Sequence, residues 1–147
     1  MIDKENCAML DKEQGLNCAQ SVLKQFSEDY GLDSRMALLL ASGFGGGMWI
    51  GSACGALTGG LMALGIAYGF TDPMGKELFE PYALELMKRF EEVMGSVNCR
   101  DIIGIDTCNP VQKAKAIEEG IYAIKCPLAI RTAVQIVESI HRQAKQQ

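Results

Sequence analysis

Hydrophobic side chains recur along most of this chain with the period of an α-helix. The segment 17–31 places Val22, Leu23 and Phe26 on one face, and the segment 127–142 carries a longer apolar face. In that last segment we expect the buried residues to be Leu128, Ile130, Val134, Val137 and Ile140. No segment shows the sustained alternation of period two that is typical of strands. The pattern therefore predicts an all-α fold, a compact helical bundle that forms a single domain over residues 1–147.

Polar residues, glycines and prolines predict where the helices begin and end. Asn17 is expected to be an N-cap, and Gln20, three positions later, completes a capping box. Pro81 falls inside an otherwise helical pattern and is expected to bend or restart its helix. The expected helices cover residues 3–13, 17–31, 34–41, 52–68, 73–95, a short segment after 98, 110–120 and 127–142.

The segment between Arg35 and Asp72 contains no charged residue, and its 36 positions are enough to cross a membrane. The glycines of 43–47 interrupt it, and its flanks lack the basic and aromatic belts of a membrane span. We therefore expect no membrane insertion and a helix buried at the centre of the bundle.

The polar first residues lack the apolar stretch of a secretory signal, so we expect a cytoplasmic location.

Small residues recur every fourth position in this central segment. They are Gly51, Gly55, Gly59, Ala63 and Ala67. On a helix they form a smooth stripe that another backbone can approach closely. A glycine-striped, buried central helix is therefore predicted. A second copy of the same helix would be a natural partner for the stripe, which suggests a homodimer.

Composition limits the chemistry that this bundle can perform. The chain has six cysteines, a single histidine and a formal net charge of -4. Its basic residues are scattered, so the sequence predicts no nucleic-acid partner. His141 falls in a polar tail and is expected at the surface, so thiolates are the main soft ligands and nucleophiles. In a reducing compartment, cysteines at this density indicate metal binding or thiol chemistry.

Four cysteines coincide with the first turns of four predicted helices. Cys18 follows Asn17, Cys99 follows Asn98, and Cys54 lies two residues after Ser52. Cys126 precedes Pro127 and would be an N-cap if that proline were the first helical residue. Free N–H groups and the helix dipole stabilise a thiolate at such positions. We therefore expect Cys18, Cys54, Cys99 and Cys126 to form one site.

The other two cysteines lack this pattern, and we interpret both as lying outside the site. Pairing of Cys108 with Cys99 stays open as an alternative. Cys7 lies in the first polar helix, and Cys108 lies in a predicted loop. No CxxC motif occurs, and the spacings of the four selected cysteines, 35, 44 and 26, exclude a local zinc motif. A metal site assembled from distant segments is compatible with these spacings.

The run from Phe44 to Met48 and the CGAxxG segment 54–59 resemble the redox-active protein family that is named for its pattern of C, GCAxxG, C and C. The resemblance extends over Gly15–Gln20, Gly95–Cys99 and Lys125–Pro127, and so covers nearly the whole chain. It implies four characteristic cysteines at positions 18, 54, 99 and 126. It also implies a small helical protein with a redox role, without naming a substrate.

Three functions follow from these residues. In the favoured one, the four thiolates hold an iron–sulfur cluster or another metal for electron transfer, as an oxidoreductase or electron-transfer protein with an unknown redox partner. In the second, Cys54 is an attacking thiolate, with Cys18 or Cys99 as the resolving partner. In the third, the cysteines only pack within a non-catalytic interaction protein. The glycines of 43–47 lack the lysine of a phosphate loop and are interpreted as a turn that enters the central helix.

Overall fold

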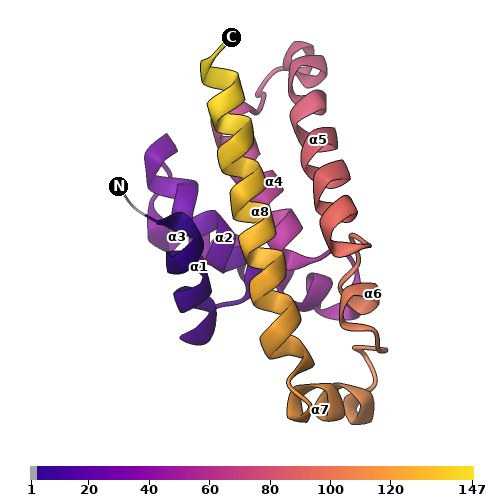
Figure 1. Ribbon diagram of the computed structural model, residues 1–147. Coiled ribbons are helices and arrows are strands. Elements are labelled where there is room, and N and C mark those ends of the chain that lie inside the picture. Colours follow the sequence, from indigo (N-terminus) through magenta and orange to yellow (C-terminus); the bar gives the residue numbers. More distant parts are fainter. Residues whose placement is uncertain (1–2) are drawn as a thin grey trace.

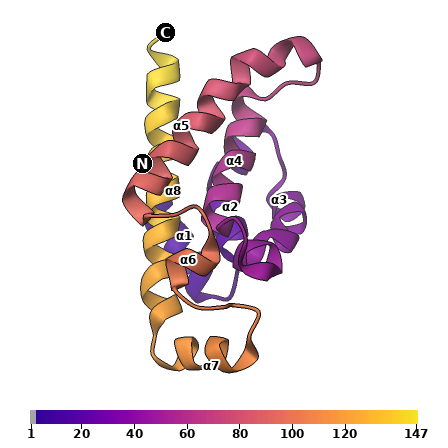
Figure 2. The same cartoon turned by 90° about the vertical axis from the view of Figure 1, so that its right-hand side faces the viewer.

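The computed structural model describes residues 3–147, and within them the fold is all-α, as predicted (Figure 1). The helices are α1 (Lys4–Glu13), α2 (Cys18–Ser27), α3 (Ser34–Ala41), α4 (Gly55–Tyr68), α5 (Lys76–Met94), α6 (Cys99–Ile103), α7 (Pro110–Glu118) and α8 (Ile121–Lys145). Helix α8 runs the length of the molecule, and α1, α2, α4 and α5 pack along it. Short helices α6 and α7 lie near the N-terminal end of α8 (Figure 2).

The predicted apolar faces form the core. Val22, Leu23 and Phe26 of α2 are buried against α4 and α8, together with Leu57 and Leu64 of α4. On α8 the buried members are Ile130, Val134, Val137 and Ile140. Leu128 was expected with them, but it is 42% exposed because its side of α8 faces away from the bundle.

Glycines of α4 let α2 approach at backbone distance. A β-carbon at Gly59 would lie 2.7 Å from the carbonyl oxygen of Ala19, and one at Gly55 would lie 3.1 Å from the backbone nitrogen of the same residue. The predicted close approach is therefore present, and its partner is α2 of the same chain. Gly51 lies before the helix, at a positive φ of 73°. Gly55 and Gly59 of the stripe pack against α2 of the same chain, so the stripe gives no argument for a homodimer.

Pro81 was expected to bend or restart its helix, and α5 runs through it as one helix without a restart. Asp72 caps a short 3₁₀ turn, Pro73–Gly75, and α5 begins directly after it. Gly95 ends α5 in the left-handed conformation, as expected of a C-terminal glycine.

The last helix begins at Ile121 instead of Pro127, and this corrects the prediction for Cys126. Gly120, at a φ of 76°, separates α7 from α8, so Cys126 lies in the second turn of α8. A proline inside a helix costs about 3 kcal/mol. Burial of Cys126 and packing of the half-buried Ile121 and Tyr122 against the core offset this cost.

The prediction of a surface histidine is wrong, because α8 extends to Lys145 and carries His141 into the bundle. The His141 side chain is 9% exposed, and its Nδ1 lies 3.3 Å from the hydroxyl of Tyr30 and 2.5 Å from that of Tyr68. Burial lowers the pKa of His141. The histidine is therefore an internal aromatic-cluster residue at the end of the bundle away from α7.

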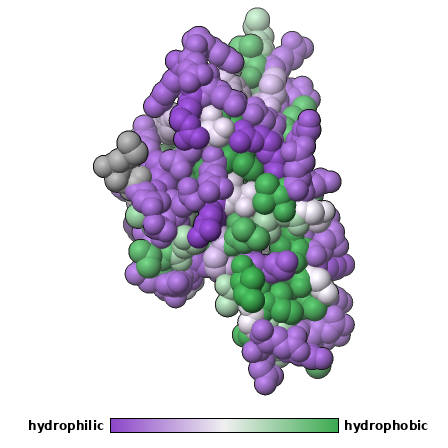
Figure 3. All heavy atoms as spheres, in the orientation of Figure 1, coloured by the Kyte–Doolittle hydropathy of each residue, from purple (hydrophilic) through white to green (hydrophobic). Residues whose placement is uncertain are grey.

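Within residues 3–147, no single helix is both long and apolar enough to cross a membrane; only α7 and α8 taken together, with an 82° bend between them, meet that criterion. Figure 3 shows apolar atoms grouped on the lower part of the visible face, where α7 and the start of α8 lie. Exposed apolar residues of these two helices include Val111, Ile117, Ile124 and Leu128.

Candidate redox site

The four cysteines selected from the sequence line a single cavity of about 350 Å³. Cys18 is the first residue of α2, Cys54 is the N-cap of α4, and Cys99 is the first residue of α6. Each of the four side chains is buried, with exposed fractions between 6% and 8%. Three of them stand at helix N-termini as expected, whereas Cys126 reaches the cavity from inside α8. Cys7 and Cys108 do not line this cavity.

A capping box holds Cys18 in place. The Asn17 side chain accepts a hydrogen bond from the Gln20 backbone at 2.8 Å, and Gln20 accepts one from the Asn17 backbone at 3.0 Å. Asn17 Nδ2 also donates to the carbonyl oxygens of Ala41 and Ser42, at 3.2 Å each. The predicted capping box therefore also links the start of α2 to the end of α3.

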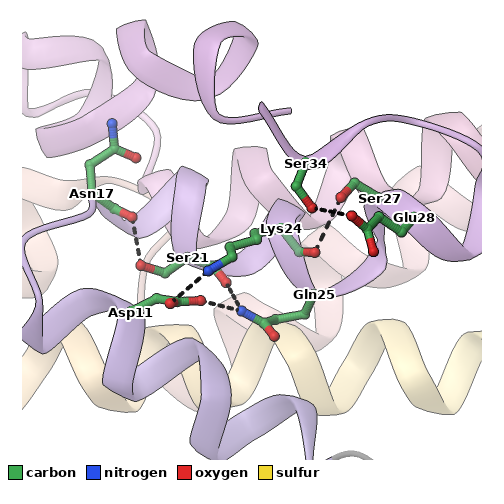
Figure 4. Close-up of polar contacts among 8 residues, drawn as sticks. All are labelled: Asp11, Asn17, Ser21, Lys24, Gln25, Ser27, Glu28 and Ser34. Carbon is green, nitrogen blue, oxygen red and sulfur yellow. Dashed lines mark hydrogen bonds and ion pairs between the residues drawn. The ribbon is translucent and has the colours of Figure 1, made fainter. Parts of the chain in front are cut away.

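Polar contacts join α1 to α2 (Figure 4). The Asp11 carboxylate accepts from Lys24 at 3.0 Å and from Gln25 at 2.7 Å. These bonds fix α1 against α2, with Lys12, the residue after Asp11, lining the cavity beside Cys18.

A short antiparallel backbone pairing joins the segments that carry Cys54 and Cys99. The Cys54 N–H donates to the carbonyl of Val97 at 2.8 Å, and the Cys99 N–H donates to that of Ser52 at 2.7 Å. Ala53 and Asn98 form the bridge between these two bonds. This pairing, which the sequence analysis missed, fixes the relative positions of two cysteines that are 45 residues apart.

The glycine-rich segment forms a left-handed turn at the wall of the cavity. Gly46, Gly47, Met48 and Trp49 all have positive φ, and for the two non-glycine residues φ is 58° and 67°. Such backbone costs about 1–2 kcal/mol for each non-glycine residue. A β-carbon at Gly47 would lie 2.5 Å from the Ser52 carbonyl oxygen and 2.9 Å from the Cys99 β-carbon. The turn packs this tightly because position 47 lacks a side chain, and it places Trp49 at the cavity.

The thiols differ in how readily they ionise. Hydrogen bonding from the Cys126 thiol lowers the pKa of Cys18 to about 7 despite burial, and the positive charge of Lys12 acts in the same direction. The same hydrogen bond, followed by burial, raises the pKa of Cys126. The thiolate is therefore concentrated on Cys18, with Cys126 as its proton-bearing partner.

The two remaining thiols are held in the neutral form. Burial raises the pKa of Cys54 to about 12, although the backbone N–H groups of Ala56 and Leu57 act in the opposite direction. Burial also raises the pKa of Cys99. A helix N-terminus alone therefore does not decide which thiol ionises, because desolvation outweighs it at both positions.

The cavity thiols do not form a site for a single metal ion in the part of the chain that the structure describes. Within residues 3–147, no three Cys, His, Asp or Glu side chains are grouped closely enough to hold a single metal ion. The four thiols instead line a cavity of about 350 Å³.

These features define a helical protein with four buried thiols around one cavity and one thiol that ionises near neutral pH. Residues 16–140 match the family model described as "Putative redox-active protein (C_GCAxxG_C_C)", and the chain belongs to that family. No curated protein and no solved structure matches the chain.

Proposed function

We propose that the protein performs thiol–disulfide exchange, with Cys18 as the attacking thiolate and Cys126 as the resolving thiol. Two observations carry this proposal: Cys18 and Cys126 are both buried at one cavity, and the neighbouring Cys126 thiol lowers the pKa of Cys18 to about 7. A thiolate with a pKa near the ambient pH is the most effective attacking thiol in such exchange.

In the reaction, the Cys18 thiolate attacks one sulfur of a disulfide RSSR and forms a mixed disulfide, while one RS⁻ leaves. Cys126 then attacks the Cys18 sulfur and releases the second RS⁻. The two protein thiols lose two protons and two electrons, and RSSR becomes two RSH. The reverse reaction reduces the protein and oxidises a partner dithiol.

This pairing differs from the one expected from the sequence, in which Cys54 attacks and Cys18 or Cys99 resolves. The pKa of Cys54, raised to about 12 by burial, disfavours its thiolate at neutral pH, whereas Cys18 has a pKa of about 7. Cys54 and Cys99 are better suited to lining the cavity and fixing its shape.

A thiol count tests this proposal. Reduced protein, equilibrated with an excess of the neutral reagent 2-hydroxyethyl disulfide in the background of Cys7→Ser and Cys108→Ser, is expected to lose two of its four thiols and to retain no bound reagent. The Cys126→Ala variant is expected to retain one hydroxyethylthio adduct, because the resolving thiol is absent. An unchanged count of four thiols would contradict exchange and favour cysteines that only pack.

A second candidate function rests on a different observation: all four cysteines of the family pattern line the cavity, and exchange uses only two of them. An iron–sulfur cluster held by the four thiolates would use every one and would supply one-electron transfer. Anaerobic purification separates the candidates. Stoichiometric iron with charge-transfer absorption supports the cluster, and colourless protein that loses two thiols supports exchange.

We retain a cytoplasmic location as part of this proposal, because exchange needs a reducing partner to restore the two thiols. That partner is a dithiol protein or a small thiol whose potential lies below that of the Cys18–Cys126 pair.

A further inference from the structure

The charge of the cavity is opposite to that of the protein. The chain carries 18 acidic and 14 basic residues. The charged side chains that line the cavity are nevertheless all lysines, namely Lys12, Lys113 and Lys125. A concave site with one sign of charge and apolar walls raises the local concentration of ligands of the opposite sign.

The three lysines come from three different helices, so their meeting is a property of the fold. Lys12 belongs to α1, Lys113 to α7 and Lys125 to α8. None of them forms a salt bridge with any residue of 3–147, whereas other basic residues, including Lys24 and Arg89, do. Of the two carboxylates next to Lys12 in sequence, Asp11 is already bound by Lys24 and Gln25, and Glu13 forms no salt bridge with Lys12 in the structure of residues 3–147. Three positive charges therefore face the cavity without a partner among the described residues.

The remaining lining is suited to a small organic molecule. Trp49 and Tyr122 supply aromatic surface, and Ile102, Ile103 and Ile117 supply aliphatic surface. Thr107 and Asn17 add polar side chains to this lining. The volume of about 350 Å³ lies at the small end of the range for ligand pockets.

We propose that the substrate is a small organic disulfide that carries two or more carboxylates, bound between the lysines with its sulfurs against Cys18. This inference rests on the proposed exchange function and adds the class of substrate. The chemistry is the exchange given above, with RSSR now an anionic disulfide that is reduced to two anionic thiols while Cys18 and Cys126 become a disulfide. The lysines hold the carboxylates at both stages and take no part in electron transfer.

Three disulfides of similar length and different charge test the proposal: 3,3′-dithiodipropionate, which is a dianion, neutral 2-hydroxyethyl disulfide, and cystamine, which is a dication. Rates of protein oxidation are measured at pH 7 and low salt. We expect the dianion to react about 100-fold faster than the dication, a ratio within the range that electrostatic steering produces. Because salt screens charges, the ratio of the two rates should fall in 0.5 M salt. Equal rates for the three reagents, with oxidation still taking place, would overturn the substrate class and leave exchange intact.

Charge-neutralising variants assign the effect to the lysines. Lys12→Gln, Lys113→Gln and Lys125→Gln are each expected to lower the ratio of dianion rate to neutral-reagent rate about fivefold, the effect of one charge a few ångströms away in a water-like medium. The ratio cancels any change in the reactivity of Cys18 itself. Lys115→Gln is the matched control, because Lys115 lies on α7 with Lys113 but does not line the cavity. An equal fall in Lys115→Gln would overturn the assignment.

A binding measurement in a variant that cannot exchange tests the substrate class independently of the exchange reaction. In the Cys18→Ser, Cys126→Ser double variant, calorimetry with 3,3′-dithiodipropionate is expected to show saturable binding that weakens in Lys113→Gln. Cystamine is expected to show none. Absence of dianion binding, combined with the same rate for all charges, would contradict the substrate class even if Cys18 and Cys126 exchange normally.

Discussion

Replacing Cys18 with serine is expected to remove the fast-reacting thiol of the protein at pH 7. In a Cys7→Ser, Cys108→Ser background, the alkylation rate with iodoacetamide should fall at least about 100-fold. A thiol with a pKa of about 7 is roughly half ionised at this pH, whereas one with a pKa of about 12 is ionised to about one part in 10⁵. The fastest thiol of the parent background should show a rate that rises with pH with a midpoint near 7.

Two variants define what produces this reactivity. Cys126→Ala removes the hydrogen bond that lowers the pKa of Cys18, so the midpoint should move to higher pH. Cys54→Ser is the control and should leave both rate and midpoint unchanged, because burial keeps the Cys54 thiol neutral at pH 7. Rapid alkylation that persists in Cys18→Ser, or that disappears in Cys54→Ser, would contradict the assignment of the thiolate to Cys18.

The largest expected effect on stability comes from Gly59→Ala in α4. The added β-carbon would lie 2.7 Å from the carbonyl oxygen and 3.0 Å from the α-carbon of Ala19, and a helix backbone cannot yield to it locally. Overpacking of this kind costs about 2–3 kcal/mol in the free energy of unfolding. For a chain of this size, the melting temperature should fall by about 5–10 °C.

Gly65→Ala is the matched control on the same helix. No atom outside the local helix lies within 4 Å of a β-carbon at Gly65, so only the helix propensity changes. This variant should stabilise the protein by about 0.5–1 kcal/mol. Thermal unfolding followed by circular dichroism measures both variants. If both variants change the free energy of unfolding in the same direction, contact with α2 is not the reason that position 59 requires glycine.

Local sequence signals predicted those features that local interactions decide. The Asn17–Gln20 capping box and the C-terminal Gly95 were both predicted, because each depends on residues within four positions of it. The glycine stripe also predicted a close helix approach. Its partner was not predictable from the stripe alone, since a smooth helix face accepts α2 of the same chain as readily as a second copy.

Tertiary packing decided the features that the sequence did not predict. Pro127 marks a common helix start, but burial of Cys126 in an earlier turn extends α8 to Ile121. His141 is followed by a polar C-terminal segment in the sequence, yet the length of α8 carries it between Tyr30 and Tyr68. The four cysteines selected from the sequence line one cavity, and their roles as a redox or metal site stay predictions. Their different ionisation was not predictable, because it depends on desolvation and on the contact between Cys18 and Cys126.

Peptide mapping of the oxidised protein tests the central claim most directly. Reduced Cys7→Ser, Cys108→Ser protein is oxidised with 2-hydroxyethyl disulfide, the remaining thiols are blocked with N-ethylmaleimide, and tryptic peptides are analysed by mass spectrometry without reduction. We expect a disulfide that joins the peptide 13–24, which contains Cys18, to the peptide 126–131, which contains Cys126, with Cys54 and Cys99 blocked. A disulfide that joins Cys54 to Cys18 or Cys99, or four blocked cysteines with no disulfide, would contradict the Cys18–Cys126 redox pair.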